Sequence, residues 1–210
     1  MKNIQQKLEE GRQYRDFAAL EPQQDEMIVE GYATTFNDPY VLFRDGNYEV
    51  QEQVDPHAFD EANTSDVVMQ YDHEGRVFAR NSNGTLSLRA DEHGLHVTAM
   101  LGGTELGRQL YEEIKGGYTN KMSFGFTVDE DKKEIVEEGD NVRVLRTILK
   151  IGRLYDVSAV SIPANDGTTI SARSYGEECV VEIAEELRKR NERKAQIERI
   201  KKLTEVQYGN

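Results

Sequence analysis

The sequence predicts a mainly β protein with flanking helices, in which a barrel or sandwich of strands is followed by a charged helical tail. Three observations predict this fold class. Short segments rich in β-branched and aromatic residues are separated by turn residues, as in barrels and sandwiches. One internal segment repeats its apolar residues at helical spacing. The last segment combines an apolar stripe with many charges. We therefore divide the chain into a β body, residues 1–175, and a helical tail, residues 176–210.

The body contains seven candidate strands, at 27–36, 65–71, 85–90, 95–101, 122–128, 142–149 and 154–162. The clearest hairpin has Asp91-Glu92-His93-Gly94 as its turn, because apolar residues alternate on both sides and glycine can adopt positive φ. The charge run 129–141 is expected to be a solvated hairpin tip or a mobile loop.

Two helices are predicted. The first is capped by Thr104, repeats apolar residues as far as Ile114 and ends at Gly116-Gly117. The second occupies the tail as one amphipathic helix or a broken pair of helices. Its apolar side carries Val180, Ile183, Ala184, Leu187, Ile197, Ile200 and Leu203.

Composition argues against several classes of function. The 210 residues carry a net charge of −13, which repels phosphate backbones, so nucleic acid is not an expected partner. No apolar run approaches the roughly 20 residues of a membrane helix, and the N-terminus lacks the apolar stretch of a secretory signal. Cys179 is the single cysteine, and nearby carboxylates would raise its pKa, which favours a structural role in a reducing cytosol.

Three short sequences could carry chemistry: Tyr71-Asp72-His73-Glu74, Lys121-Met122-Ser123-Phe124-Gly125-Phe126 and Leu154-Tyr155-Asp156-Val157-Ser158. In the second, strand alternation puts Ser123 on the face opposite Phe124, beside the space left by Gly125. In the third, Asp156 is a carboxylate in an apolar strand and needs a partner to offset its desolvation.

A serine nucleophile needs a base to take its proton and a third group to orient that base. His73 and Asp156 could fill these roles for Ser123, although the spacing alone says nothing about proximity. Structural explanations stay open for each residue. Ser123 could be a small packing residue, His73 could bond to a backbone carbonyl, and Asp156 could pair with Arg153 or Arg173.

Other reaction classes lack their motifs. The chain has no G-x-S-x-G elbow, no H-E-x-x-H helix, no glycine-rich phosphate loop and no pair of cysteines. Asp72-His73-Glu74 is a poor metal site, because neighbouring strand residues point in opposite directions. We therefore expect neither a metal nor another cofactor.

The order of its short motifs makes the chain resemble the tailed-bacteriophage prohead serine proteases, which are related to herpesvirus assemblin. The resemblance covers about residues 27–173. Its motifs are Glu30-Gly31-Tyr32-Ala33 with Phe36-Asn37, Val54-Asp55-Pro56-His57-Ala58-Phe59, Tyr71-Asp72-His73, Leu86-x-Leu88 with Gly94-Leu95, Met122-Ser123-Phe124-Gly125-Phe126, and Asp156-Val157-Ser158-Ala159-Val160-Ser161 before Pro163-Ala164.

The resemblance implies an assemblin-like β-barrel with Ser123 as nucleophile and His73 as base. Herpesvirus relatives use a second histidine as the third member, whereas the phage pattern has an acidic residue, usually glutamate, at the position of Asp156. His57 also departs from the family, which usually has glycine there, so His57 is an alternative third member.

The resemblance also implies a biological setting. It predicts a serine endopeptidase in the host cytoplasm, inside the assembling procapsid, that cleaves the major capsid protein, the scaffold segment and itself. A homo-oligomer stays open. Candidate oxyanion donors are the loop at 165–167 and residues near Arg173. The competing interpretations are a catalytically inactive assembly or scaffolding factor with the same fold, and an unrelated β-barrel binding module.

Overall fold

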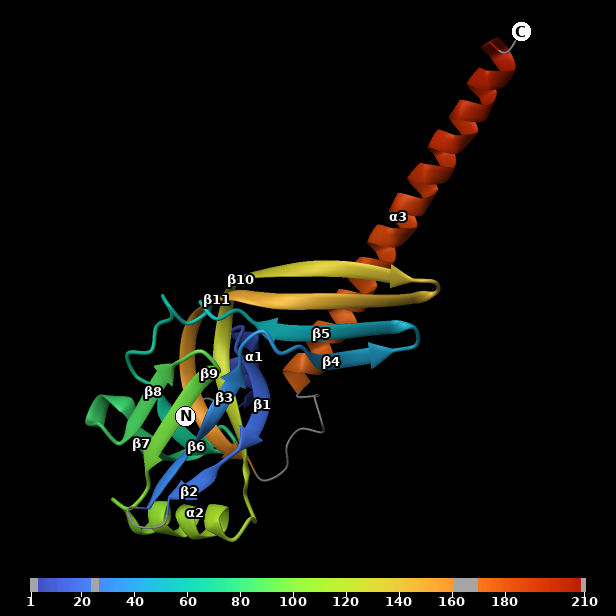
Figure 1. Cartoon of the computed structure of the whole chain (residues 1–210). Coiled ribbons are helices and arrows are strands. Elements are labelled where there is room, and N and C mark those ends of the chain that lie inside the picture. The colour runs from blue at the N-terminus through green and yellow to red at the C-terminus, as the bar shows by residue number, and fades with distance from the viewer. Residues whose placement is uncertain (1–3, 24–26, 161–169, 209–210) are drawn as a thin grey trace.

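The structure is a computed structural model that describes residues 4–23, 27–160 and 170–208, and it shows a mainly β protein with one long C-terminal helix (Figure 1). The helices are α1 (Ile4–Glu9), α2 (Glu105–Lys115) and α3 (Ile170–Tyr208), with a short 3-10 turn at Asn81–Asn83. The strands are β1 (Gln13–Ala19), β2 (Glu21–Gln23), β3 (Ile28–Thr35), β4 (Tyr40–Asp45), β5 (Tyr48–Val54), β6 (Val68–Tyr71), β7 (Glu74–Arg80), β8 (Leu86–Ala90), β9 (Gly94–Met100), β10 (Lys121–Glu138) and β11 (Asn141–Val160).

The larger sheet is organised around two long strands, β10 and β11. Its main order in the described chain is β1-β10-β11-β5-β4, and β6 adds to β11 and carries β7. Along one stretch, β11 pairs in parallel with β5 over 142–148, and near its C-terminal end it pairs in parallel with β6 over 156–159. The two ends of β11 therefore lie in different parts of the sheet. One end is near β4 and β5, and the other end is near β1 and β6.

The main core lies where the larger sheet meets the smaller one, whose order is β2-β3-β9-β8. Alternation in the sequence explains the packing, because Leu95, Val97 and Ala99 of β9 are all buried. From β10 the core receives Phe124 and Phe126, whose rings stack 4.5 Å apart. Figure 1 shows α2 beneath this body, and its residues Leu110, Tyr111 and Ile114 belong to the same core.

The described strands form two open sheets rather than the closed barrel that we expected. The pairing of β10 with β11 shifts register several times between Gly125 and Asp131. Beyond these shifts the two strands continue as a hairpin beside the β4–β5 hairpin, and both project from the body (Figure 1). Because β10 and β11 continue into this extension, the larger sheet stays open and does not close into a barrel.

The Asp91–Gly94 hairpin is confirmed, but the reason for its glycine is different from the one we predicted. The Asp91 N–H donates to the Gly94 carbonyl at 3.0 Å, and β8 pairs with β9. Gly94 is not one of the described glycines that have positive φ. A Cβ at this position would lie 2.0 Å from the backbone oxygen of Thr34, so glycine is needed for the close approach of β3.

The long hairpin was only partly predicted. Segments 142–149 and 154–162 belong, as far as Val160, to one strand. The charge run 129–141 does form an exposed hairpin tip, one of the two alternatives predicted for it, but most of the run is paired strand. Its tip turns at Gly139, which has a φ of 64°. Charged residues reach into this strand because its outer half is largely exposed, so charge does not conflict with pairing.

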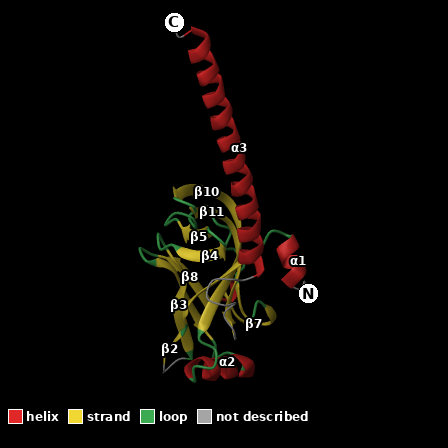
Figure 2. Ribbon diagram, turned by 90° about the vertical axis from the view of Figure 1, so that its right-hand side faces the viewer, coloured by secondary structure: helices red, strands yellow, loops and turns green. Residues whose placement is uncertain are grey.

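Both predicted helices are present. Thr104 caps α2, since its Oγ1 accepts the Gly107 N–H at 2.9 Å. The tail is one continuous helix, and its first part packs on the sheet extension through Cys179, Val180, Ile183 and Leu187. Farther along, Ile197 and Ile200 are exposed, where α3 extends past the body (Figure 2). Among the described helices, none is both long and apolar enough to cross a membrane.

Candidate active site

Ser123 lies near the start of β10, between β1 and the end of β11. Its backbone pairs with Asp16 on one side and with Ser158 on the other. Its neighbour Phe124 points into the core, so the serine side chain projects from the opposite face, as alternation predicts. The Ser123 side chain is fully buried.

His73 lies in the tight turn between β6 and β7. Tyr71 pairs with Glu74, so Asp72 and His73 form a two-residue turn, with φ of 47° and 59°. Positive φ at both turn residues is the pattern of a type I′ turn, and it costs non-glycine residues on the order of 1–2 kcal/mol each. The Nζ of Lys7, from α1, donates a hydrogen bond to the backbone carbonyl of His73.

Asp156 lies on β11, opposite Gly125 on β10 and beside Val68 on β6. The parallel pairing of β6 with β11 therefore places the turn between β6 and β7, which contains His73, next to this carboxylate. Ser158, two residues along the strand, donates its hydroxyl to Asp156 Oδ1 at 2.9 Å. Asp156 is 1% exposed.

The three predicted residues meet in a continuous chain of hydrogen bonds. The Nε2 of His73 is 2.7 Å from Ser123 Oγ, and its Nδ1 is 2.5 Å from Asp156 Oδ1. With a proton on Nδ1 donated to the carboxylate, Nε2 carries a lone pair directed at the serine hydroxyl. This arrangement can move a proton from serine to imidazole and stabilise the resulting imidazolium.

The serine hydroxyl has a second neighbour. Its Oγ is also 2.9 Å from the backbone carbonyl oxygen of Arg15, on β1. A hydroxyl has one proton, so with neutral His73 the imidazole and this carbonyl compete for it. In this structure the Ser123 hydroxyl is therefore held between the His73 imidazole and an adjacent strand.

Gly125 leaves room for two groups of the site. A Cβ at Gly125 would lie 2.6 Å from Asp156 Oδ2 and 2.6 Å from Cε1 of Tyr14. The Tyr14 ring in turn lies 4.3 Å from the His73 ring, centroid to centroid. Burial, and next the negative charge of Asp156, raise the pKa of Tyr14, so its hydroxyl stays protonated at neutral pH. The space beside Gly125 is thus filled by site residues.

The structural explanations left open by the sequence find less support in the geometry. The imidazole of His73 contacts Ser123 and Asp156, while the Arg153 guanidinium stacks on Tyr155 at 4.9 Å. His57 lies elsewhere, 82% exposed in its side chain, with Nδ1 3.0 Å from Asp60 Oδ2. The loop at 165–167, motif residues 161–164 and the Arg173 side chain lie outside what the structure describes.

Some contacts around the triad were not predicted. Ser158 could have been found, because it shares a strand face with Asp156. Tyr14 and Lys7 gave no signal, since β1 and α1 were not among the expected elements. In the described ranges no three histidine, cysteine or acidic residues cluster as metal ligands would.

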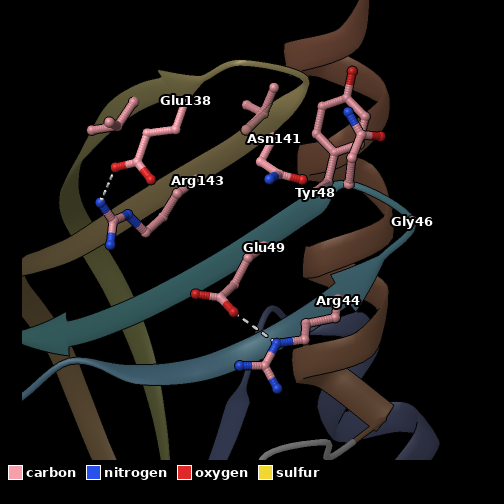
Figure 3. A pocket seen from close by; sticks show the side chains of 10 residues that line it. Arg44, Gly46, Tyr48, Glu49, Glu138, Asn141 and Arg143 are labelled. Atoms are coloured by element: carbon pink, nitrogen blue, oxygen red, sulfur yellow. Dashed lines mark hydrogen bonds and ion pairs between the residues drawn. The ribbon is translucent and has the colours of Figure 1, made fainter.

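A pocket lies at the tips of the β4–β5 and β10–β11 hairpins (Figure 3). Its charged residues largely pair with each other, as Arg44 with Glu49 at 2.7 Å and Arg143 with Glu138 at 2.9 Å. The hydrogen bond from Arg44 lowers the pKa of Glu49. The residues that line this pocket include no serine–histidine contact like that of Ser123 with His73.

Comparison with known proteins agrees with the resemblance in the sequence. No curated protein sequence matches this chain. A solved structure, that of the bacteriophage T4 capsid assembly protease gp21, is similar over 72% of this chain and 99% of its own, with 10% identity and a TM-score of 0.39. The family of Caudovirus prohead serine proteases matches residues 15–180, which is most of the chain, and the chain belongs to this family.

Proposed function

We propose that the chain is a serine endopeptidase with Ser123 as nucleophile, His73 as general base and Asp156 as the group that orients the base. The hydrogen-bonded chain from serine through imidazole to carboxylate carries this proposal, with distances of 2.7 and 2.5 Å. Ser123, His73 and Asp156 are all buried, so neither contact is a solvent-exposed pairing.

In the proposed reaction Ser123 Oγ attacks a peptide carbonyl while His73 Nε2 takes its proton. The imidazolium then protonates the leaving amine, and water hydrolyses the acyl-enzyme by the same route in reverse. Asp156 accepts the hydrogen bond from Nδ1 and so holds the proton on that nitrogen. The Ser158 hydroxyl supports this state by donating to the carboxylate.

Ser123 is buried in this arrangement, so a substrate must displace its surroundings before attack. For attack, the Ser123 hydroxyl must donate to His73 and give up its contact with the Arg15 carbonyl. A substrate carbonyl must also reach a side chain that is fully buried here. We infer that peptide binding moves the groups that lie against Ser123.

Membership of a prohead protease family supports polypeptides of the assembling capsid as substrates. We propose the major capsid protein and the scaffold segment, with cleavage of the protease itself as a further reaction. The proposed place of action is the interior of the procapsid in the host cytoplasm.

Ser123→Ala tests the assignment with little risk to the fold, since it removes one hydroxyl from a small-residue position. Co-expressed with the major capsid protein of the same phage, the parent should release fragments that mass spectrometry identifies, and Ser123→Ala should release none. A fluorophosphonate probe should label the parent only. The control is Ser87→Ala, on the exposed side of β8.

Cleavage by a folded Ser123→Ala protein would remove Ser123 from the mechanism. A folded parent that neither cleaves nor reacts with the probe would instead identify an inactive assembly factor.

A further inference from the structure

We propose that Tyr14 and Lys7 are positioning residues that fix the imidazole of His73 in its working orientation. This inference rests on the proposed role of His73 as general base. Neither residue is part of the triad: Lys7 lies on α1 and Tyr14 lies on β1.

The turn that carries His73 needs outside support. Its two residues, Asp72 and His73, both have positive φ. Backbone in this region persists where surrounding contacts over-determine it. The His73 carbonyl is held by the ammonium of Lys7, a charge-assisted hydrogen bond at a site where both residues are buried. Lys7 therefore restrains the backbone of the turn.

The side chain of His73 has a restraint of its own. Its two ring nitrogens are engaged by Ser123 and Asp156, and the ring itself packs against Tyr14, with centroids 4.3 Å apart and planes tilted by 58°. A neighbour at this distance blocks rotation of the imidazole out of line. Loss of the Tyr14 ring would open space into which the His73 imidazole could rotate.

Tyr14 is itself fixed in place. It is 3% exposed and its backbone pairs with Gly125, the residue that leaves room for its ring. The contact with His73 is made by the Tyr14 ring, so its contribution to His73 is packing. The aromatic ring, and not the hydroxyl, should be the part that matters for positioning.

The first test compares Tyr14→Ala with Tyr14→Phe in the full chain on a capsid-derived peptide. Tyr14→Ala should lower kcat about 10²-fold with KM little changed, because a displacement of about 1 Å in a catalytic group can cost that much. Tyr14→Phe should recover most of kcat. Tyr111→Ala is the matched control, since it removes an equally buried tyrosine from α2 and should lower stability without lowering kcat of the folded protein.

A second readout needs no substrate. The Nδ1 proton of His73, hydrogen-bonded to Asp156, should give a low-field proton NMR signal that is lost in Tyr14→Ala and kept in Tyr14→Phe. This signal reports the orientation of the imidazole and does not depend on Ser123 being the nucleophile. If Ser123→Ala left hydrolysis intact, the proposed function would fail, but the NMR signal would still test the roles of Tyr14 and Lys7.

Lys7→Met tests the backbone restraint with little effect on the core. It should lower kcat about 10-fold, whereas Lys132→Met, at a half-exposed lysine of β10, should not. Unchanged kcat and an unchanged NMR signal in folded Tyr14→Ala and Lys7→Met would overturn the proposal. An increase in kcat/KM would also overturn it, because the segment would then restrict access to the site.

Discussion

At the scale of single residues, Gly125 has a specific role because two groups of the site approach it from different elements. The carboxylate of Asp156 comes from β11 and the ring of Tyr14 comes from β1, and both lie where a side chain would begin. A methyl group there would push against a buried charge and against the ring that contacts His73.

Gly125→Ala should therefore lower kcat/KM about 10²-fold through displacement of the triad, and overpacking should cost about 1–3 kcal/mol of stability. Steady-state kinetics and urea unfolding would measure the two effects. Gly103→Ala is the control, because a Cβ at Gly103 meets nothing within 4 Å. A fully active Gly125→Ala protein would contradict the close packing at the site.

Asp156→Asn should leave the fold intact and reduce kcat severely, by up to about 10⁴-fold, since an amide can hold the wrong tautomer of the base. His57→Ala should have no effect on rate, because His57 is exposed and contacts Asp60. Kinetics of both variants on one peptide would show the difference. A larger loss in His57→Ala would transfer the role of third member to His57.

The residues of the site were predictable to different degrees. Ser123, His73 and Asp156 stood out through motif order, but their spacing could not bring them together. Their meeting depends on the parallel pairing of β6 with β11, which no local pattern encodes. Tyr14 and Lys7 were not predicted as residues of the site. They contact the ring and the backbone carbonyl of His73, and such contacts produce no periodic pattern in the sequence.

At the scale of elements, α3 changes character along its length. Its first part contributes Cys179, Val180, Ile183 and Leu187 to a core with Leu42 and Val50 of the extension, whereas Ile197 is 48% exposed. The apolar stripe looked uniform in the sequence, since periodicity shows which face is apolar but not where a partner ends. A truncation after Ser174 would remove this packed part, so a truncation that tests the distal helix alone should begin beyond Arg190.

Ile183→Ala should destabilise the protein by about 2–5 kcal/mol, because it opens a cavity between α3 and the sheet extension. Ile197→Ala, in the exposed part of the same helix, should stay within about 0.5 kcal/mol of the parent. Chemical denaturation followed by circular dichroism measures both. Equal effects of the two substitutions would mean that the distal helix also packs on the body.

At the scale of the whole molecule, one buried ionic network joins β1 to the neighbouring strands β5 and β11, across the width of the larger sheet. Arg15 of β1 donates to both carboxylate oxygens of Glu52 on β5, at 2.5 and 3.0 Å, and Arg146 of β11 donates to the same carboxylate at 2.7 Å. Burial alone would raise the pKa of Glu52, but the two guanidinium groups, Arg15 first, outweigh burial and hold its pKa below the usual 4.5.

Glu52→Gln should cost about 3–5 kcal/mol, because it leaves buried guanidinium charge without its carboxylate. Since folding lowers the pKa of Glu52, its contribution is complete above pH 4.5 and is lost as the pH falls through the lowered value. Unfolding measured at pH 7 and pH 3 should therefore show a smaller difference between parent and variant at the lower pH. A constant difference would exclude Glu52 as the titrating group.

The central place of β11 also has a consequence for the order of events during synthesis. β11 pairs with β10, β5 and β6, and the contact of His73 with Asp156 spans 83 residues. Contacts of such separation form late, because the intervening chain must first be closed into a loop. While the ribosome adds residues at about 5–20 per second, a chain that ends before β11 has a serine and a histidine but no carboxylate to align them. On the proposed mechanism, the nascent protein should therefore be unable to hydrolyse peptide bonds until almost the whole body has been made.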